Sequence, residues 1–124
     1  GEDIYDDERN LYLHASPWPS YYQLHTPLVF WFSQGYRQLY PQRTNLVAEH
    51  RKDPVQSDCI FPTMLTLGGI HTKINQDTLS LASPDYRIKA QRHYLTDHNQ
   101  SVTLDRCLEP QDFVQLRKRN LRPY

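Results

Sequence analysis

The sequence lacks long hydrophobic runs and any excess of charge of one sign. Its longest uninterrupted apolar stretch is Leu28–Phe32, whereas a membrane-spanning helix needs roughly 18 apolar residues or more. Lys and Arg together number 14, as do Asp and Glu, so the formal net charge is zero. A balanced charge gives no field that would attract nucleic acid or an anionic membrane. The sequence therefore predicts no nucleic-acid partner and no membrane span among these residues.

Cysteine is scarce, and the chain has neither a signal peptide nor a Met at its start. Cys59 and Cys107 could form one disulfide, which would indicate an oxidising compartment. They could equally remain separate thiols, with Cys59 a small apolar residue on a buried helix face. The number of cysteines leaves both possibilities open. We interpret the opening Gly-Glu-Asp-Ile as that of a processed or engineered piece.

The residues that are present predict an α/β chain. Leu28–Ser33 is the clearest strand, and its apolar residues do not alternate with polar ones. Both faces of such a strand should be covered, as in a parallel sheet flanked by helices. A helix is expected over Gln34–Asp53, bent or split at Pro41. A second helix should begin near Ser57, with a cap from that side chain or from Asp58, and end at the two glycines 68 and 69.

The two ends of the chain carry weaker patterns. Gln91–Thr96 and Ser101–Asp105 are expected to pair as an antiparallel hairpin, and Asp112–Asn120 as a last helix. Residues 1–27 show no periodicity, although a short strand or helical turn is possible near Leu11–Leu13. An ordered loop of this length usually carries function.

The predicted strand over Leu28–Ser33 has too few partners in this sequence. A central strand needs a neighbour at each edge, because unpaired backbone groups there are costly. The other strand candidates are few, polar and late in the chain. The sequence therefore resembles the last part of a larger fold.

Two histidines, His14 and His25, lie eleven residues apart in the aromatic and proline-rich N-terminal segment. Imidazole suits zinc binding and proton transfer near neutral pH. Two histidines are not a metal site, however, since structural zinc takes four ligands and catalytic zinc about three. Spacing alone leaves functional and structural roles open. The remaining histidines are scattered singly and are expected at surface or satisfied core positions: His50, His71, His93 and His98.

Five short segments occur in a particular order. They are Gly1–Asp3, Leu-His-x-x-Pro at Leu13–Pro17, Gln-x-His-x-Pro at Gln23–Pro27, the strand Leu28–Ser33, and Ser57–Leu65 followed by Gly69-Ile70. This order resembles the phosphoethanolamine transferases, sulfatase-fold enzymes of the alkaline-phosphatase superfamily that modify lipid A, lipopolysaccharide core and related glycans. In that family Asp-His-Gly-Glu is followed by Tyr-Leu-His, by Gln-x-x-x-Pro and by an apolar strand containing Trp. The resemblance covers about residues 1–75.

The resemblance implies roles for three residues. His14 matches the catalytic and substrate-binding histidine that faces the substrate phosphate or a second metal ion, and His25 matches a substrate-side histidine of many members. Glu2 matches the end of Asp-His-Gly-Glu and would support the metal ligands without binding zinc. Those ligands and the nucleophilic Thr would lie upstream of Gly1, so no metal ligand is expected within the chain. The segment from Glu2 to His14 is longer and more acidic than the family pattern, and Ala15 stands where Gly is usual.

The resemblance further implies the C-terminal portion of a three-layer, alkaline-phosphatase-like (sulfatase) catalytic domain. Residues 1–27 would be an active-site loop, 28–70 a strand-helix-helix unit, and 71–124 a C-terminal hairpin and helix. The parent enzyme would use zinc to move phosphoethanolamine from phosphatidylethanolamine to a lipid A or glycan acceptor through a phosphothreonine intermediate. It would act at the periplasmic face of the inner membrane, held there by N-terminal spans.

Isolated from the upstream part of the same polypeptide, the chain is expected to bind no cofactor and to be inactive. One alternative keeps the superfamily and changes the reaction, to a sulfatase-type hydrolase or a phosphoglycerol transferase. Another is a non-catalytic binding module whose histidines are structural.

Overall fold

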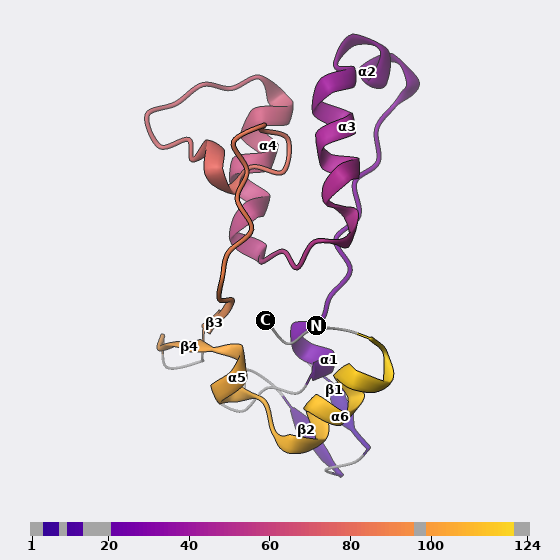
Figure 1. Cartoon of the computed structure of the whole chain (residues 1–124), viewed down its shortest axis with the longest axis vertical. Coiled ribbons are helices and arrows are strands. Elements are labelled where there is room, and N and C mark those ends of the chain that lie inside the picture. The colour runs from indigo at the N-terminus through magenta and orange to yellow at the C-terminus, as the bar shows by residue number, and fades with distance from the viewer. Residues whose placement is uncertain (1–3, 8–9, 14–20, 96–98, 121–124) are drawn as a thin grey trace. The chain divides into compact units, whose positions relative to one another are not determined.

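The structure is a computed structural model that describes residues 4–7, 10–13, 21–95 and 99–120. Its contacts divide the chain into two compact units, one of residues 29–89 and one of residues 1–28 together with 90–124. The elements of both units are labelled in Figure 1. Each unit is described by itself.

The first unit begins with two helices that meet at a proline. Helix α2 (Gln34–Leu39) starts at Ser33, whose Oγ accepts a hydrogen bond of 3.1 Å from the backbone N–H of Tyr36. Helix α3 (Pro41–Glu49) has Pro41 in its first turn, where the missing N–H costs nothing. A short 3-10 helix, η1 (His50–Lys52), continues α3. The predicted helix over residues 34–53 and its break at Pro41 are confirmed.

The second predicted helix of this unit is also confirmed, but its expected cap is absent. A 3-10 turn, η2 (Ser57–Cys59), leads into α4 (Ile60–Gly68), and no side chain caps the start of either one. The helix ends because Gly69 takes a left-handed conformation with φ of 67°. That conformation lets the N–H of Ile70 bond the carbonyl of Leu65 at 2.9 Å.

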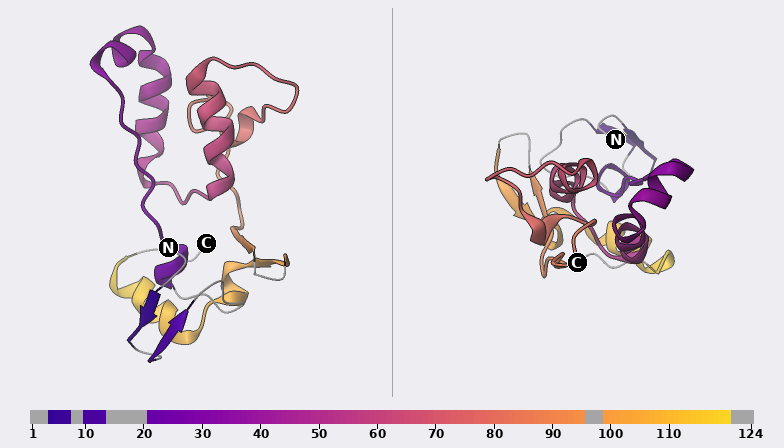
Figure 2. Two further views of the ribbon diagram at one scale, coloured as in Figure 1. Left: turned by 180° about the vertical axis from the view of Figure 1, so that it is seen from behind. Right: turned by 90° about the horizontal axis from the view of Figure 1, so that it is seen from above.

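Helices α3 and α4 lie side by side in this unit (Figures 1 and 2) and enclose its core. The buried core residues are Val47, Cys59, Leu67, Leu81 and Ala82, with Phe30, Phe32, Tyr36, Val55 and Tyr86 packed against them. After η3 (Asp77–Leu79), the chain returns to this core between α4 and the end of the unit. Six of these ten residues therefore come from segments with no regular structure.

Buried hydroxyl groups attach the returning segment to α4. Thr63 and Ser80 have no exposed surface. The N–H of Leu81 donates to Thr63 Oγ1 at 2.9 Å, and Ser80 Oγ donates to Thr66 Oγ1 at 2.8 Å. Because backbone groups away from water need partners, these threonines determine where residues 80–82 can lie.

The predicted strand over Leu28–Ser33 is not a strand in the structure. Residues 25–33 have no regular secondary structure. The prediction correctly identified an apolar segment that packs against the core, since Phe30 and Phe32 do so. It was wrong about the ladder, because the described residues supply no neighbouring strand: both of their sheets are antiparallel pairs formed elsewhere. The three-layer fold stays a prediction.

The described residues of the second unit form two antiparallel hairpins and three helices. Its elements are β1 (Ile4–Asp6), β2 (Leu11–Leu13), α1 (Tyr21–Leu24), β3 (His93–Leu95), β4 (Ser101–Thr103), α5 (Leu104–Cys107) and α6 (Pro110–Lys118). The hairpin β3–β4 pairs His93 with Thr103 and confirms the predicted one. Helix α6 confirms the predicted last helix but starts two residues earlier, at Pro110, behind a capping box of Glu109 and Asp112.

The hairpin β1–β2 was only half predicted. The possible strand at Leu11–Leu13 is present, whereas its partner Ile4–Asp6 was not recognised. The rings of Tyr5 and Tyr12 face each other across the pair with centroids 4.8 Å apart. Asn10, with φ of 53°, provides the left-handed residue near the turn.

Replacing Thr63 by Val tests the hydroxyl attachment. Thr63→Val keeps the shape of the side chain but leaves the buried N–H of Leu81 without its acceptor, so we expect a loss of about 1–3 kcal/mol of unfolding free energy. Urea unfolding followed by circular dichroism measures this loss. Thr72→Val is the matched control, because Thr72 is exposed, and should change stability by less than about 0.5 kcal/mol. Equal stability of the two variants would contradict the assignment.

Candidate functional site

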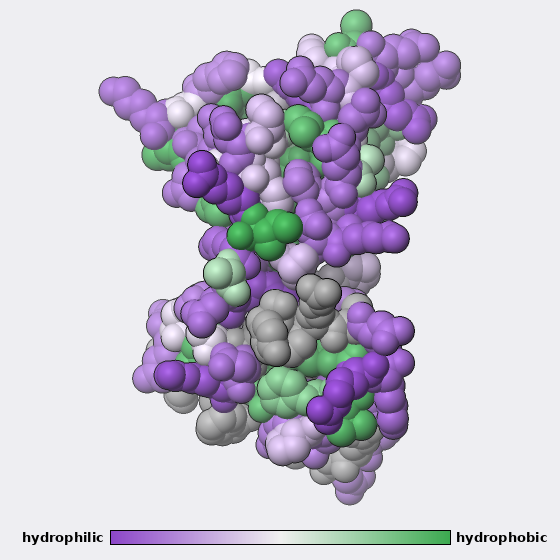
Figure 3. Space-filling view, viewed as in Figure 1, coloured by the Kyte–Doolittle hydropathy of each residue, from purple (hydrophilic) through white to green (hydrophobic). Residues whose placement is uncertain are grey.

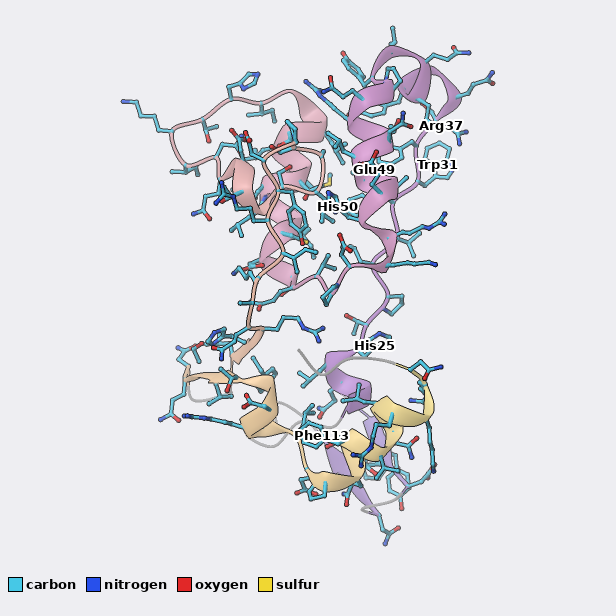
Figure 4. The ribbon with its side chains drawn as sticks, in the orientation of Figure 1. His25, Trp31, Arg37, Glu49, His50 and Phe113 are labelled. Atoms are coloured by element: carbon cyan, nitrogen blue, oxygen red, sulfur yellow. The ribbon has the colours of Figure 1, made fainter. Side chains whose placement is uncertain are left out.

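Of the three predicted site residues, only His25 lies among the described residues. It follows α1 and is exposed, as Figure 4 shows. Glu2 and His14 lie outside the described residues, so the predicted site stays a prediction. Within the described ranges, no three His, Cys, Asp or Glu side chains are grouped so that they could hold a metal ion.

One small pocket, partly open to solvent, lies in the unit of residues 29–89. Its cavity volume is about 10 Å³, which is room for about one water molecule. The residues that line it are Pro54, Gln56, Asp58, Cys59, Leu79, Tyr86, Arg87 and Lys89. They come from the connection between α3 and α4 and from the last residues of the unit. The pocket is too small to enclose a substrate, so only the chemistry of the side chains that line it bears on a functional site.

The charged groups of the pocket neutralise each other in part. Lys89 Nζ forms an ion pair with Asp58 Oδ2. The N–H of Arg87 donates to the carbonyl of Thr78 at 2.9 Å, which fixes the backbone on this side of the pocket. The ion pair joins residues 31 positions apart in sequence. Both of its side chains are about one-third exposed, so screening by water keeps its contribution to stability small.

His50 packs behind Tyr86, one of the residues that line the pocket. His50 Nδ1 lies 2.7 Å from Asp53 Oδ2, and the His50 ring packs against the ring of Tyr86 with centroids 4.5 Å apart. His50 sits at the end of α3, on the side that faces α4 (Figure 4). The expectation that His50 is a satisfied histidine is confirmed. His71 and His93 are exposed, as expected, and His98 lies outside the described residues.

Burial makes Cys59 a poor nucleophile. Its side chain is 2% exposed, and burial together with the neighbouring Asp58 carboxylate raises the pKa of the thiol. The thiolate is the reactive form of cysteine, so a raised pKa keeps Cys59 inert near neutral pH. Burial, followed by the nearby Cys59, Asp53 and Asp58, likewise raises the pKa of Tyr86. The pocket therefore offers an ion pair and protonated groups, and it lacks an activated nucleophile.

Both cysteines are buried thiols, Cys59 in the unit of residues 29–89 and Cys107 in the other unit. In Cys107, burial raises the pKa to about 11.

Sequence reasoning did not find the pocket. Asp58 and Lys89 carry no local signal of their pairing, because nothing in the sequence indicates that positions so far apart will meet. The pair of His50 and Asp53 did have a signal, namely a spacing of three residues at a helix end, which places side chains on one face.

Comparison of the chain with family models, with curated proteins and with solved structures finds no match of any of the three kinds. Among the described residues, no helix has the length and apolar character required to cross a membrane. The functional argument therefore depends on the residues of the chain themselves.

The titration of Cys107 predicts how stability depends on pH. The unfolded thiol loses its proton near pH 9.0, whereas the folded thiol keeps it up to about pH 11. The stabilisation that Cys107 provides is therefore complete below pH 9 and is lost as the pH rises toward 11, by roughly 2 kcal/mol. Cys107→Ala lacks this titration. The difference in unfolding free energy between wild type and Cys107→Ala should shrink over this range.

Unfolding by urea at pH 8, 9, 10 and 11 measures this difference. Leu116→Ala is the control, since Leu116 is buried in the same unit and does not titrate. The difference in unfolding free energy between wild type and Leu116→Ala should stay constant over this pH range. If the unfolding free energies of Cys107→Ala and Leu116→Ala changed with pH in parallel, burial would not protect the thiol proton of Cys107.

Proposed function

We propose that this chain is the C-terminal portion of the catalytic domain of a zinc-dependent phosphoethanolamine transferase. The parent would move phosphoethanolamine from phosphatidylethanolamine to a lipid A or glycan acceptor through a phosphothreonine intermediate, at the periplasmic face of the inner membrane. The single observation that carries the proposal is the ordered series Gly1-Glu2, Leu13–Pro17, Gln23–Pro27, the apolar segment from Leu28, and Ser57–Leu65.

In this proposal His14 is the residue of the chain that touches the substrate. Its imidazole would donate a hydrogen bond to a non-bridging phosphoryl oxygen, or give a proton to the oxygen that leaves when the nucleophilic Thr attacks phosphorus. His25 would line the same side of the substrate, and Glu2 would orient the upstream metal ligands. Zinc, when bound, would lower the energy of negative charge on the phosphoryl oxygens. In this proposal the ligands of the metal come from upstream polypeptide.

The surface of α4 supports the idea that further polypeptide belongs against this unit. The buried face of the helix carries Thr63, Thr66 and Leu67. The opposite face is apolar, and Ile60, Phe61 and Met64 there are 40%, 58% and 56% exposed. An exposed group of large apolar side chains commonly marks a contact surface. Figure 3 shows hydrophobic side chains reaching the surface in the face that it displays.

The chain by itself should have no transferase activity. Without the nucleophilic Thr and the metal ligands, incubation with phosphatidylethanolamine and a lipid A acceptor should give no product, and metal analysis should find no stoichiometric zinc. Turnover or a tightly bound zinc ion in the 124-residue chain would overturn the proposal.

The positive test uses the polypeptide extended upstream to include a nucleophilic Thr and an Asp-His pair. In that protein His14→Ala should lower turnover by about 10²- to 10⁴-fold, because one proton donor is lost. His71→Ala is the matched control, since His71 is exposed and belongs to none of the five segments. Its turnover should equal that of wild type. An upstream reading frame without these residues, or equal effects of the two substitutions, would favour a non-catalytic module.

A further inference from the structure

Two turns of the first unit carry large apolar side chains that are exposed. At the junction of α2 and α3, Leu39 and Tyr40 are 75% and 43% exposed. After the end of α4, Ile70 and Ile74 are 52% and 68% exposed. Figures 1 and 2 show α2 and the loop after α4 at the same end of this unit. Both turns therefore bring apolar side chains to one end of the unit.

Contacts within the unit hold these two turns together. The hydroxyl of Tyr36 and Nη1 of Arg43, the latter at 3.4 Å, both donate to the carbonyl of Leu67 near the end of α4. The guanidinium of Arg43 also lies over the ring of Tyr40, 4.8 Å from its centroid. The start of α3 is thereby attached to the end of α4, so the two turns form one surface.

This surface carries positive charge and no negative charge. It consists of residues 37–43 and 70–74, which we call the tip, and its charged residues are Arg37, Arg43 and Lys73. Surface charges act over only about 10 Å at 0.1 M salt, so the local charge matters even though the whole chain is neutral. The acidic residues of the unit all lie outside the tip: Glu49, Asp53, Asp58, Asp77 and Asp85.

Apolar side chains accompanied by cations are complementary to an anionic lipid surface. In such contacts the apolar residues enter the boundary between headgroups and acyl chains, while Lys and Arg meet the negative headgroups. Tyrosine suits this depth, because its ring is apolar and its hydroxyl is polar. The opposite end of α3 lacks this complementarity, because Asp53 lies there beside His50.

We propose that the tip docks on the surface of a membrane that contains anionic phospholipid. Its apolar side chains would enter the headgroup boundary, and its cations would meet the lipid phosphates. The contact lies on the membrane and does not cross it. The inference depends on the tip and not on the proposed transferase activity, so either can fail without the other.

Co-sedimentation of the 124-residue chain with lipid vesicles tests the docking. We expect binding to vesicles of equal parts phosphatidylcholine and phosphatidylglycerol, and little binding to vesicles of phosphatidylcholine alone, which have no net charge. Raising the salt concentration from about 0.1 M to about 0.5 M should weaken the binding, because salt screens the attraction.

Two pairs of substitutions remove the same charge from different places. Arg37→Gln combined with Lys73→Gln removes two cations of the tip and should weaken binding to the anionic vesicles about thirtyfold. Arg51→Gln combined with Lys52→Gln is the matched control, because it removes two exposed cations of η1, outside the tip. The control pair should leave vesicle binding unchanged.

A second comparison tests the apolar part of the contact. Ile74→Ser should weaken vesicle binding by about tenfold, because it removes apolar surface that would enter the membrane. Ile88→Ser is the matched control, since Ile88 is 51% exposed and lies outside the tip. It should have no effect on binding. Circular dichroism verifies that all variants keep their helices.

Failure to bind the anionic vesicles, or equal binding to the neutral ones, would overturn the proposal. Equal weakening by the tip pair and by the η1 pair would also overturn it, because it would indicate a response to the charge of the whole chain. Binding to soluble polyglutamate as tight as binding to vesicles, and unchanged by Ile74→Ser, would assign the tip to an acidic polypeptide and exclude the lipid contact.

Discussion

The unit of residues 29–89 depends on a few buried hydroxyl groups of α4. Thr63 accepts the N–H of Leu81, and Thr66 accepts the hydroxyl of Ser80. These bonds hold a segment without regular structure against the helix, and that segment contributes Leu81 and Ala82 to the core. The pocket follows from the same attachment, because Tyr86, Arg87 and Lys89 come directly after it. Polar contacts thus decide the position of much of the apolar core.

This arrangement explains why α4 is apolar on its outer side. The face that would ordinarily supply large side chains to the core instead carries Thr63 and Thr66, whose oxygens are needed by the returning segment. Ile60, Phe61 and Met64 are left outward and partly exposed. Val29 and Trp31, in the segment without regular structure before α2, are likewise apolar and exposed. Two elements of one unit therefore present exposed apolar side chains at the surface of that unit.

Features set by neighbouring residues could be predicted from the sequence. The break at Pro41, the end of α4 at Gly69 and the hairpin β3–β4 depend on interactions within a few positions, and all three were predicted. The strand over Leu28–Ser33 failed for the opposite reason: its apolar content was read correctly, but a strand exists only when a partner supplies hydrogen bonds. The hairpin partner Ile4–Asp6 was missed because three residues are too few to show the alternation of a strand.

The candidate site was even harder to predict from the sequence, because it depends on contacts between residues far apart in the chain. Asp58 and Lys89 meet only after the chain has returned past α4, and the burial that raises the pKa of Cys59 depends on that return. By contrast, the proposed roles of Glu2, His14 and His25 come from motifs in a short N-terminal stretch and need no tertiary contact to be read. Motifs of this kind can suggest a reaction even where the other residues that the reaction needs are not in the same segment.

The proposed chemistry and the apolar surfaces lead to the same requirement by independent routes. Phosphoryl transfer through a threonine would need a nucleophile and a ligated metal, supplied by other polypeptide, beside His14. The extended segment needs hydrogen-bonding neighbours, and α4 needs a cover for its outer face. One upstream sheet with its helices would meet all three needs, since metal ligands in α/β folds commonly follow the carboxyl ends of strands. A binding module would account for exposed apolar faces, but it would give no reason for the order of the N-terminal motifs. The transferase proposal would account for both, because the upstream part of such an enzyme would supply the sheet and the metal ligands.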